Sequence, residues 1–180
     1  MTSDDARLDV LVLGLGNVLC GDDGAGVIVA HRLRREYEMP RGVRVVDGGT
    51  LGLDLLALVA ASDRVILIDA VRGDGPPGTL VRLAGEDVAP AVYERLSMHQ
   101  IGVADLLAGA ALCESYPREV VIVGVVPETT SLAYGCTPDV TDSLRALGER
   151  VLDELRRMGY EAVPRAEAAP GNDNARALGL

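Results

Sequence analysis

The sequence predicts a three-layer α/β/α fold in which helices cover both faces of a mixed, mostly parallel β-sheet. Short runs of branched apolar residues alternate along the chain with segments whose apolar residues recur at helical spacing, an order typical of parallel strands joined by helices. In one place two expected strands follow each other with no helix between them, which indicates one antiparallel strand. A length of 180 residues, 48% hydrophobic and 24% charged, suits one globular domain.

Five segments are expected to form the strands, because each is short, apolar and bounded by turn residues. They are residues 8–13, 43–46, 64–68, 79–83 and 119–126. The fourth segment alternates between apolar and polar residues and follows a turn rich in Gly and Pro, so it is expected to be half-exposed and antiparallel. The fifth is the most apolar run and is expected to be a central strand.

Four segments with helical spacing of apolar residues are expected to be helices: residues 26–37, 51–61, 98–114 and 139–158. Ser97 and Gln100 fit a capping box, which would put His99 in the first turn of the third helix. Thr137-Pro138 offers an N-cap and an N1 proline for the fourth. The domain is expected to span residues 1–164, and residues 165–180, rich in Ala, Pro, Gly and Asn, to form a flexible tail.

Charge and composition exclude several classes of function. The net charge is −10, all 17 basic residues are Arg, and five Tyr are the only aromatic residues. Such a chain repels phosphate and offers few rings for base stacking, so nucleic acid and anionic membranes are poor partners. Residues 1–9 do not resemble a leader, and no apolar run approaches the roughly 18 residues of a membrane helix. A cytoplasmic protein is expected, and nothing demands more than a monomer.

The three cysteines are widely spaced and form no CxxC pair. They are Cys20, Cys113 and Cys136. An odd number of such residues is typical of free thiols in a reducing compartment, and we expect all three to be buried.

Acidic residues follow several of the expected strands at the point where each ends. Asp22 and Asp23 come after the first strand, Asp47 after the second, Asp69 after the third and Glu128 after the fifth. The carboxyl ends of parallel strands meet at one edge of a sheet, where ligands of open α/β folds bind, so we expect these carboxylates to share a crevice. Carboxylates brought together need a cation or a proton. A cation site is therefore the leading hypothesis.

Each of these carboxylates also has a structural alternative. Asp22 or Asp23 is suited to cap the helix that begins near Gly24. Asp47 and Asp69 are suited to accept hydrogen bonds from loop amides, the commonest role of an Asp at a strand end. The convergence of several acids on one edge, rather than any one of them, supports the cation site.

Two glycine patterns after the first expected strand resemble nucleotide-binding motifs but fail at decisive positions. Gly14-Leu15-Gly16 supplies the first two glycines of the dinucleotide fingerprint, and Leu19 stands where the third belongs. Residues 16–21 have the spacing of a P-loop, but Asp22 and Asp23 replace the Lys and the Ser or Thr that hold phosphate. A nucleotide site is therefore disfavoured.

The chain has two histidines, which are expected to differ in role. His31 lies among Arg and Glu residues on the polar face of a helix and is expected to be a surface residue. His99, at the positive end of a helix dipole, is favoured as a neutral ring that can bind a metal, with packing or capping as an equal alternative. A nucleophilic Cys20–His99 pair is a further alternative, but nothing local marks Cys20 as an activated thiolate.

Five motifs follow one another between about residues 8 and 164. They are Leu13-Gly14-Leu15-Gly16-Asn17-Val18-Leu19 with Gly21-Asp22-Asp23-Gly24-Ala25-Gly26, then Asp47-Gly48-Gly49-Thr50, Ile68-Asp69-Ala70, His99-Gln100-Ile101-Gly102, and Gly124 to Pro127-Glu128. In this order the set resembles the hydrogenase maturation endopeptidases, which process the C-terminus of [NiFe]-hydrogenase large subunits. The ordered set is much more specific than any one motif.

The resemblance implies a mixed five-stranded sheet between helical layers and a catalytic metal site formed by Asp23, Asp69 and His99. Asp47 belongs to a family segment whose role is less clear, and it is a further candidate. The first-loop acid is Glu in some members, and Asp23 keeps its charge and its oxygen donor. Two carboxylates and an imidazole suit a borderline divalent ion such as Ni²⁺ or Zn²⁺, and we expect Zn²⁺ or Cd²⁺ to substitute for Ni²⁺ in vitro.

The resemblance also implies the substrate, a large-subunit precursor that loses its C-terminal extension after nickel insertion. The nickel ion is expected to arrive bound in the precursor, so that the protease reads it as proof of insertion. Whether the ion serves recognition, polarises the scissile carbonyl or activates a water is left open by the sequence. Two other classes stay as alternatives: a non-catalytic hydrogenase assembly chaperone and a nucleotide-binding α/β enzyme.

Overall fold

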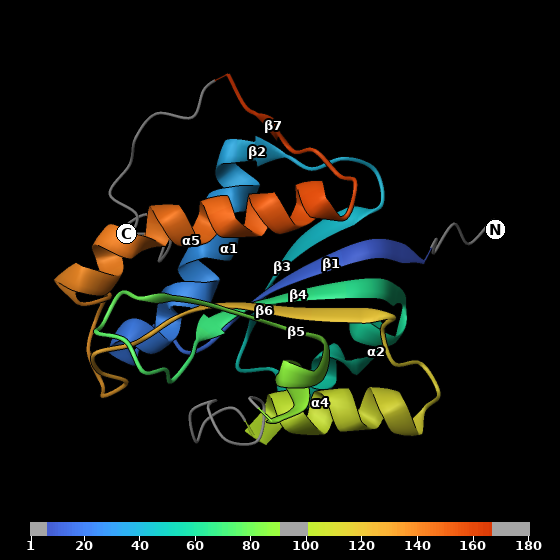
Figure 1. The fold of residues 1–180 in the computed structure, drawn as a ribbon, viewed down its shortest axis with the longest axis horizontal. Helices are drawn as coiled ribbons and strands as arrows, with labels where there is room; N and C mark the ends of the chain where they lie inside the picture. The colour runs from blue at the N-terminus through green and yellow to red at the C-terminus, as the bar shows by residue number, and fades with distance from the viewer. Residues whose placement is uncertain (1–6, 91–100, 167–180) are drawn as a thin grey trace.

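The computed structural model describes residues 7–90 and 101–166, and a five-stranded sheet lies at its centre (Figure 1). The strands are β1 (Leu8–Leu15), β3 (Val43–Gly49), β4 (Ser62–Ala70), β5 (Leu80–Ala84) and β6 (Glu119–Val125). They lie in the order β3-β1-β4-β6-β5, and of these five β5 alone runs antiparallel to its neighbour. The predicted mixed, mostly parallel sheet is confirmed, with β6 in its interior.

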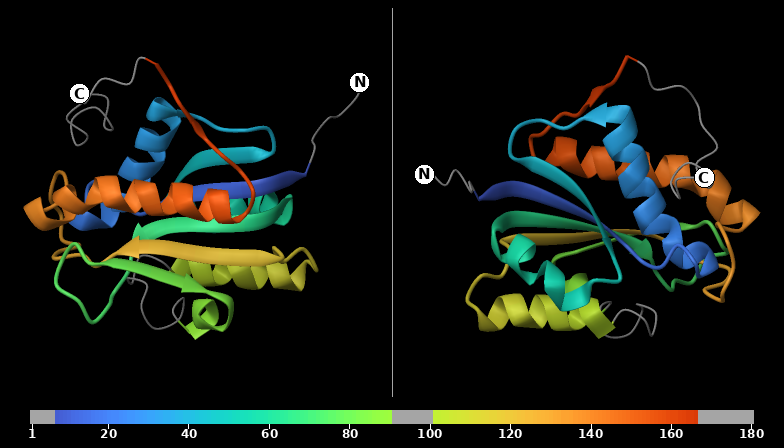
Figure 2. Two further views of the ribbon diagram at one scale, coloured as in Figure 1. Left: turned by 45° about the horizontal axis from the view of Figure 1, so that its top comes forward. Right: turned by 180° about the vertical axis from the view of Figure 1, so that it is seen from behind.

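Helices cover both faces of the sheet and give the predicted three layers (Figures 1 and 2). α1 (Ala25–Glu36) and α5 (Pro138–Arg157) lie on one face, and α2 (Leu56–Ala60) and α4 (Ile101–Leu112) lie on the other. Short 3₁₀ helices occupy three of the connections: η1 (Gly21–Gly24), η2 (Gly52–Leu55) and η3 (Gly85–Asp87).

The core has two halves because successive side chains of a strand point to opposite faces of the sheet. Val10 and Val12 of β1 belong to the apolar cluster under α1 and α5. Leu11, which lies between these two valines, and Leu13, which follows Val12, belong to the apolar cluster on the opposite face, which also contains Leu106 of α4. β1 is therefore buried on both faces, as is typical of an interior parallel strand.

Several elements differ from their predicted ranges at the ends. β1 and β3 continue to Leu15 and Gly49, closer to the acidic loops than predicted. The helix predicted over residues 51–61 is a 3₁₀ turn followed by five residues of α-helix. Gly52 has a φ of +53°, which a right-handed α-helix excludes, so the α-helix begins only later. The predicted cap of α4, Ser97 with Gln100, lies outside the described residues.

The structure also contains a second, two-stranded sheet, which the sequence analysis did not predict. β2 (Tyr37–Glu38) pairs antiparallel with β7 (Val163–Pro164), which joins the end of α1 to the chain beyond α5. Arg165 extends this contact, because its main-chain N–H donates to the Glu36 carbonyl at 2.8 Å and its Nε donates to the Tyr37 carbonyl at 3.1 Å. Residues 167–180 of the predicted tail lie outside the described residues.

Two glycines allow α1 to pack closely against the sheet. A Cβ on Gly26, in the first turn of α1, would lie 2.1 Å from the carbonyl oxygen of Ile68 and 2.5 Å from that of Leu15. A Cβ on Gly14 of β1 would lie 2.4 Å from the carbonyl oxygen of Gly26. The backbones of α1, β1 and β4 therefore meet without intervening side chains. This packing explains the glycine-rich motif without a bound nucleotide.

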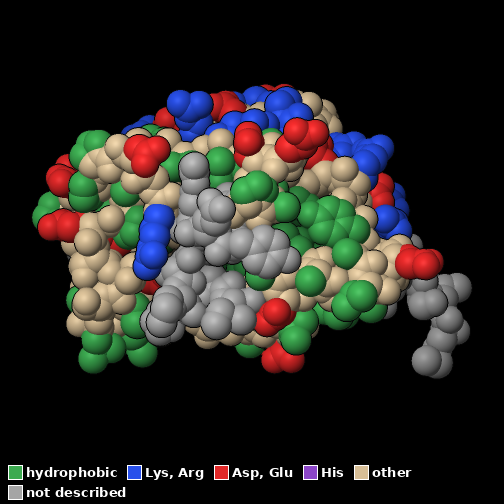
Figure 3. Space-filling view, turned by 60° about the horizontal axis from the view of Figure 1, so that its bottom comes forward, with side chains coloured by type: hydrophobic (Ala, Val, Ile, Leu, Met, Phe, Trp, Pro, Cys, Tyr) green, Lys and Arg blue, Asp and Glu red, His purple; other side chains and the backbone are tan. Residues whose placement is uncertain are grey.

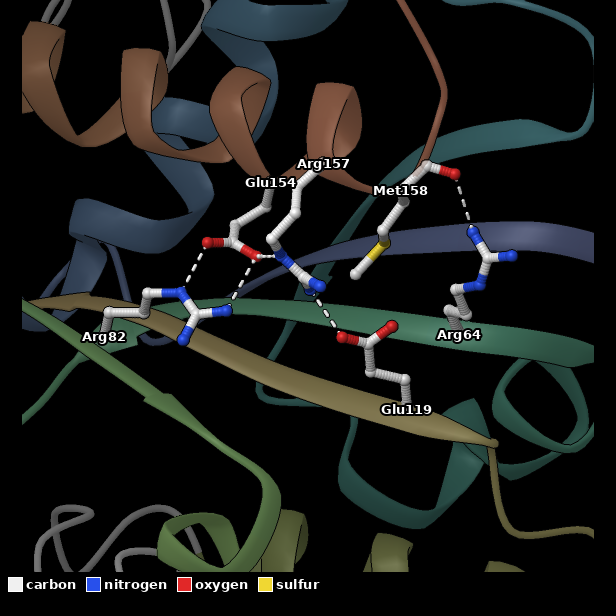
Figure 4. A network of polar contacts seen from close by, with 6 residues as sticks. All are labelled: Arg64, Arg82, Glu119, Glu154, Arg157 and Met158. Atoms are coloured by element: carbon white, nitrogen blue, oxygen red, sulfur yellow. Dashed lines mark hydrogen bonds and ion pairs between the residues drawn. The ribbon is translucent and has the colours of Figure 1, made fainter.

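A network of ion pairs joins the C-terminal part of α5 to the sheet (Figure 4). Glu154 of α5 accepts hydrogen bonds from Arg82 of β5 and, at 2.8 Å, from Arg157 of α5. Arg157 also pairs with Glu119 at the start of β6. Arg64 of β4 donates to the main-chain carbonyl that follows α5, at 2.9 Å. One end of α5 is thus tied to three strands.

The cysteine prediction is partly wrong. All three thiols are free, but Cys113 is exposed and Cys20 and Cys136 are half-buried. Cys113 directly follows the last residue of α4, where the chain has left the helix layer and the core no longer covers it. Within residues 7–90 and 101–166, no helix combines the length and the apolar character that crossing a membrane requires.

Candidate functional site

The carboxyl ends of β1, β3 and β4 meet at one edge of the sheet, and the candidate carboxylates lie there. Gly14 of β1 pairs with Ile68 of β4, the residue before Asp69, and on the other side with Asp47 of β3. η1, which carries Asp23, packs against β4. The structure therefore brings three of the predicted site residues to one edge, because parallel strands all end on the same side.

Asp23 is fully buried in η1, between the end of β1 and the start of α1. Its Oδ2 accepts a hydrogen bond from the main-chain N–H of Asn17 at 2.7 Å. Gly16 provides the space: its φ is +113°, and a Cβ there would lie 1.7 Å from the main-chain oxygen of Asp23. The N-cap residues of η1 and α1 are Cys20 and Gly24, so the alternative that Asp22 or Asp23 is the N-cap of the helix near Gly24 is wrong.

Asp69 lies near the end of β4 and is 1% exposed. Its Oδ1 is 2.7 Å from the main-chain N–H of Ala70, which donates to it. This contact matches the structural alternative for a strand-end Asp. Burying carboxylates at one edge is costly unless hydrogen bonds or a cation offset the lost hydration. The pair Asp23 and Asp69 therefore suits a cation.

Asp22 is also fully buried, but its carboxylate is occupied by the segment that follows β6. Oδ2 accepts from the main-chain N–H groups of Glu128 at 2.8 Å and Thr129 at 3.1 Å. Oδ1 accepts from the N–H of Thr137 at 2.7 Å and lies 3.0 Å from its hydroxyl. Thr137 is the N-cap of α5, so the negative charge also lies at the positive end of that helix dipole. Asp22 has a structural role.

Asp47 contacts a residue that the sequence prediction placed elsewhere. Nε2 of His31, on α1, lies 2.7 Å from Oδ2 of Asp47, and the two side chains are 35% and 36% exposed. His31 is partly exposed on the polar face of its helix, as predicted, but its contact with Asp47 was not predicted. α1 packs over β3, and this contact turns part of the helix's polar face toward the carboxyl end of that strand.

His99, the predicted nitrogen ligand, lies outside the described residues. α4 begins at Ile101, near the end of the sheet where the parallel strands have their carboxyl ends, which are drawn as arrowheads in Figure 1. Over residues 7–90 and 101–166, no three His, Cys, Asp or Glu side chains form a group that could hold a metal ion. The predicted ligand set includes a residue beyond that range, so the set stays a prediction.

The half-buried thiol of Cys136 is a poor candidate for a nucleophile. Burial raises the pKa of the Cys136 thiol to about 12, and the negative charge of Asp22 acts in the same direction. Because the thiolate is the reactive form, Cys136 is inert at neutral pH. Cys20 takes part in a main-chain bridge with Ala133, and the partner that the alternative assigns to it, His99, lies outside the described residues.

Comparison with known proteins decides the family. The family model described as hydrogenase maturation protease matches residues 27–154. The hydrogenase 2 maturation protease of Escherichia coli (strain K12) is 38% identical over 157 residues, which cover 87% of this chain and 96% of that protein. The chain belongs to the hydrogenase maturation protease family. It is therefore a peptide hydrolase, as the motif resemblance predicts.

Further relatives support the same assignment. The hydrogenase expression/formation protein HoxM of Cupriavidus necator is 38% identical over 169 residues, covering 89% of this chain and 81% of that protein. The solved hydrogenase maturating endopeptidase HybD from E. coli is 36% identical, with a TM-score of 0.83 over 89% of this chain and 100% of that chain. The [NiFe] hydrogenase maturation protease HybD from Thermococcus kodakarensis is 29% identical, with a TM-score of 0.68 over 82% and 99%. The predicted family and fold are confirmed.

The sequence analysis did not predict two contacts at the carboxyl edge of the sheet, that of Asp22 with Thr137 and that of His31 with Asp47. Asp22 and Thr137 are 115 positions apart, and no spacing rule connects them. The Thr137-Pro138 cap was a usable signal for the start of α5, which is confirmed. It gave no indication that the threonine would also bind a carboxylate from another loop. The His31–Asp47 pair depends on how α1 lies across β3, which local pattern does not encode.

Proposed function

We propose that this hydrolase is an endopeptidase that removes the C-terminal extension of a [NiFe]-hydrogenase large-subunit precursor after nickel insertion. The observation that carries the proposal is the position of two buried carboxylates, Asp23 and Asp69, at the carboxyl edge of the sheet in a chain of this protease family. We also propose that the protein acts in the cytoplasm and as a monomer. The three free thiols, which suit a reducing compartment, support the cytoplasmic location.

In this proposal the nickel ion belongs to the substrate. Asp23 and Asp69 supply carboxylate oxygens and His99 an imidazole nitrogen, a donor set that suits a borderline divalent ion such as nickel. Three protein donors leave positions for ligands that the precursor already contributes. The enzyme then binds the loaded precursor more tightly than the empty one, which links cleavage to completed insertion. A bound divalent ion can supply Lewis acidity to a carbonyl or to water.

The test is the mass of the large subunit before and after incubation with each variant. We expect Asp23→Asn, Asp69→Asn and His99→Ala to remain folded and to leave a nickel-loaded precursor at full length, because each removes one donor. Asp153→Asn is the matched control, since Asp153 is exposed near the C-terminal end of α5, whereas the N-terminal end of that helix lies at the edge. Retained processing in all three site variants would falsify the site. Cleavage of nickel-free precursor at the wild-type rate would refute the sensing role.

Asp47 requires a separate arm of the same assay. Its carboxylate lies at the candidate site and also pairs with His31. Asp47→Asn therefore removes a negative charge from both. A loss of processing as complete as that of Asp23→Asn adds Asp47 to the catalytic residues. Near-normal processing together with a lower melting temperature assigns it to the contact between α1 and β3.

The two alternative functions make different predictions in this assay. An assembly chaperone binds the precursor and leaves its mass unchanged. A nucleotide-binding enzyme requires an accessible helix N-terminus, whereas η1 places two buried carboxylates directly before α1. The carboxylates there favour a cation over a phosphate.

A further inference from the structure

We propose that residues 129–137, here called the docking arm, receive the uncharged, apolar stretch of the precursor that adjoins the bond to be cut. The inference rests on the function proposed above and names the surface that its substrate uses. The docking arm follows β6 and leads into α5, at the edge where Asp23 and Asp69 lie. Four observations support it: exposed apolar side chains, a rigid anchor, contact with the turn that carries Asp23, and the absence of charge.

Large apolar side chains of the docking arm face water. Leu132 is 85% exposed and Tyr134 is 71% exposed. Leu19, which lies across a main-chain bridge from the docking arm, is 44% exposed. Three such side chains on two adjoining loops form an apolar patch, and patches of this kind mark binding sites when they lie together beside a functional group.

Hydrogen bonds fix the position of the docking arm and thereby keep its apolar side chains exposed. The carboxylate of Asp22 binds the docking arm at both ends, through Thr129 and Thr137. In the middle, the N–H of Ala133 donates to the carbonyl of Leu19 at 3.0 Å, and the N–H of Gly21 donates to the carbonyl of Ala133 at 2.9 Å. A segment anchored at three points presents its side chains in one arrangement, which lowers the entropic cost of binding a partner.

The docking arm is continuous with the candidate site. Gly21 and Asp22, which bind it, are the two residues before Asp23 in η1. Asp23 and Asp69 are 0% and 1% exposed, so these carboxylates offer almost no surface of their own to hold a peptide, and exposed segments nearby must do so. The docking arm is the exposed segment that the described structure places against this turn.

The charge of the surroundings defines the occupant. Residues 129–138 contain no charged residue, and the exposed residues that flank them, Glu128 and Asp139, are both acidic. On the face seen in Figure 3, basic and acidic side chains gather together along the upper edge, and hydrophobic or uncharged side chains make up much of the described surface below them. An uncharged apolar peptide gains from contact with such a surface, whereas a phosphate polymer or a strongly charged peptide does not.

The chain offers a matched control in Leu112. It is 86% exposed, as much as Leu132, but it ends α4, close to where the chain turns to enter β6 at the opposite edge of the sheet. A general effect of removing a surface leucine therefore appears at both positions, while a docking effect appears only at the docking arm.

The experiment compares the double variant L132S/Y134S with L112S in steady-state cleavage of nickel-loaded precursor. We expect L132S/Y134S to raise KM by at least about tenfold, because two apolar contacts are lost, and to change kcat less than about twofold. L112S should match the wild type in both constants. An unchanged KM in L132S/Y134S, or an equal rise in L112S, overturns the proposal. If L132S/Y134S melts well below the wild type, the milder Leu132→Ala is measured by the same criteria.

Precursor binding, measured by calorimetry, separates this inference from the proposed function. If the wild type binds the precursor without cutting it and L132S/Y134S binds at least about tenfold more weakly, the docking arm is supported and the protease assignment fails. If the wild type cuts and the double variant keeps the wild-type KM and affinity, the docking arm alone fails. A wild-type dimer that L132S/Y134S dissociates would show that a second copy occupies the arm, and this also overturns the proposal.

Discussion

Asp22 and Asp23 are adjacent, both fully buried, and differ in what surrounds their carboxylates. The two oxygens of Asp22 accept from main-chain and hydroxyl donors of the segment after β6. Asp23 faces the turn after β1, where it accepts from Asn17. A carboxylate surrounded by N–H donors in this way is a structural anchor. The motif Gly21-Asp22-Asp23-Gly24 therefore combines a positioning residue with a proposed ligand.

Asp22→Asn should destabilise the fold by about 3 kcal/mol, because an amide N–H then points at main-chain N–H donors that lose their acceptor. Chemical denaturation at neutral pH measures the change in the free energy of unfolding. Asp142→Asn, an exposed substitution of the same kind, should stay within about 0.5 kcal/mol of the wild type. A loss of less than about 1 kcal/mol in Asp22→Asn would contradict the anchoring role.

At the scale of elements, α1 is positioned by direct backbone contact with β1 and β4. Gly14 and Gly26 remove the side chains that would separate them. This contact places the start of α1, and η1 before it, against the ends of two parallel strands. The glycines that resemble a nucleotide motif thus determine where the carboxylates of η1 lie.

Two helical glycines test this packing with the same substitution. Gly26→Ala places a Cβ 2.1 Å from the carbonyl oxygen of Ile68, and we expect a loss of about 3 kcal/mol in unfolding free energy as α1 is displaced. Gly148→Ala, in α5, meets its nearest atom at an ordinary 3.7 Å. It should raise stability by about 0.5–1 kcal/mol, because alanine favours a helix. If Gly26→Ala proves as stable as the wild type, direct backbone packing is wrong.

For the molecule as a whole, the ion-pair network at the C-terminal end of α5 joins this helix to β5 and β6. Hydrogen bonds from Arg82 hold the pKa of Glu154 below its ordinary value of 4.5; burial opposes this, and Arg157 reinforces it. A lowered pKa in the folded state means that the ionised carboxylate stabilises the fold. That contribution is complete above pH 4.5 and disappears as the pH falls through the lowered pKa.

Glu154→Gln should therefore lower the free energy of unfolding by about 1 kcal/mol at pH 7, a modest figure because both arginines are partly solvated. The gap between variant and wild type should narrow as the pH falls below 4.5, because protonated Glu154 resembles Gln. Urea denaturation across this range measures it. Glu149→Gln, in an exposed pair with Arg145, should show almost no gap at any pH. A gap for Glu154→Gln that is constant with pH would contradict the linkage.

Local pattern was sufficient for most of the fold. The five strands, the antiparallel member and the cap of α5 at Thr137-Pro138 were predicted, because periodicity, turn residues and caps act over a few neighbouring residues. The meeting of Asp23, Asp47 and Asp69 at one edge was also predictable, since the direction of parallel strands alone implies it. Strand ends were less accurate, because pairing with neighbours extends them.

Only the tertiary structure shows which partners several of these residues meet. Asp22 finds its donors 106 to 115 positions away, His31 meets Asp47 across a helix–strand contact, and β2 finds β7 at the far end of the chain. Such partners depend on where packed elements come to lie, and sequence spacing does not encode that position. The sequence by itself determined the α/β architecture, the family and a shortlist of acids at one edge. Packing then supplied the donors that give Asp22 its structural role.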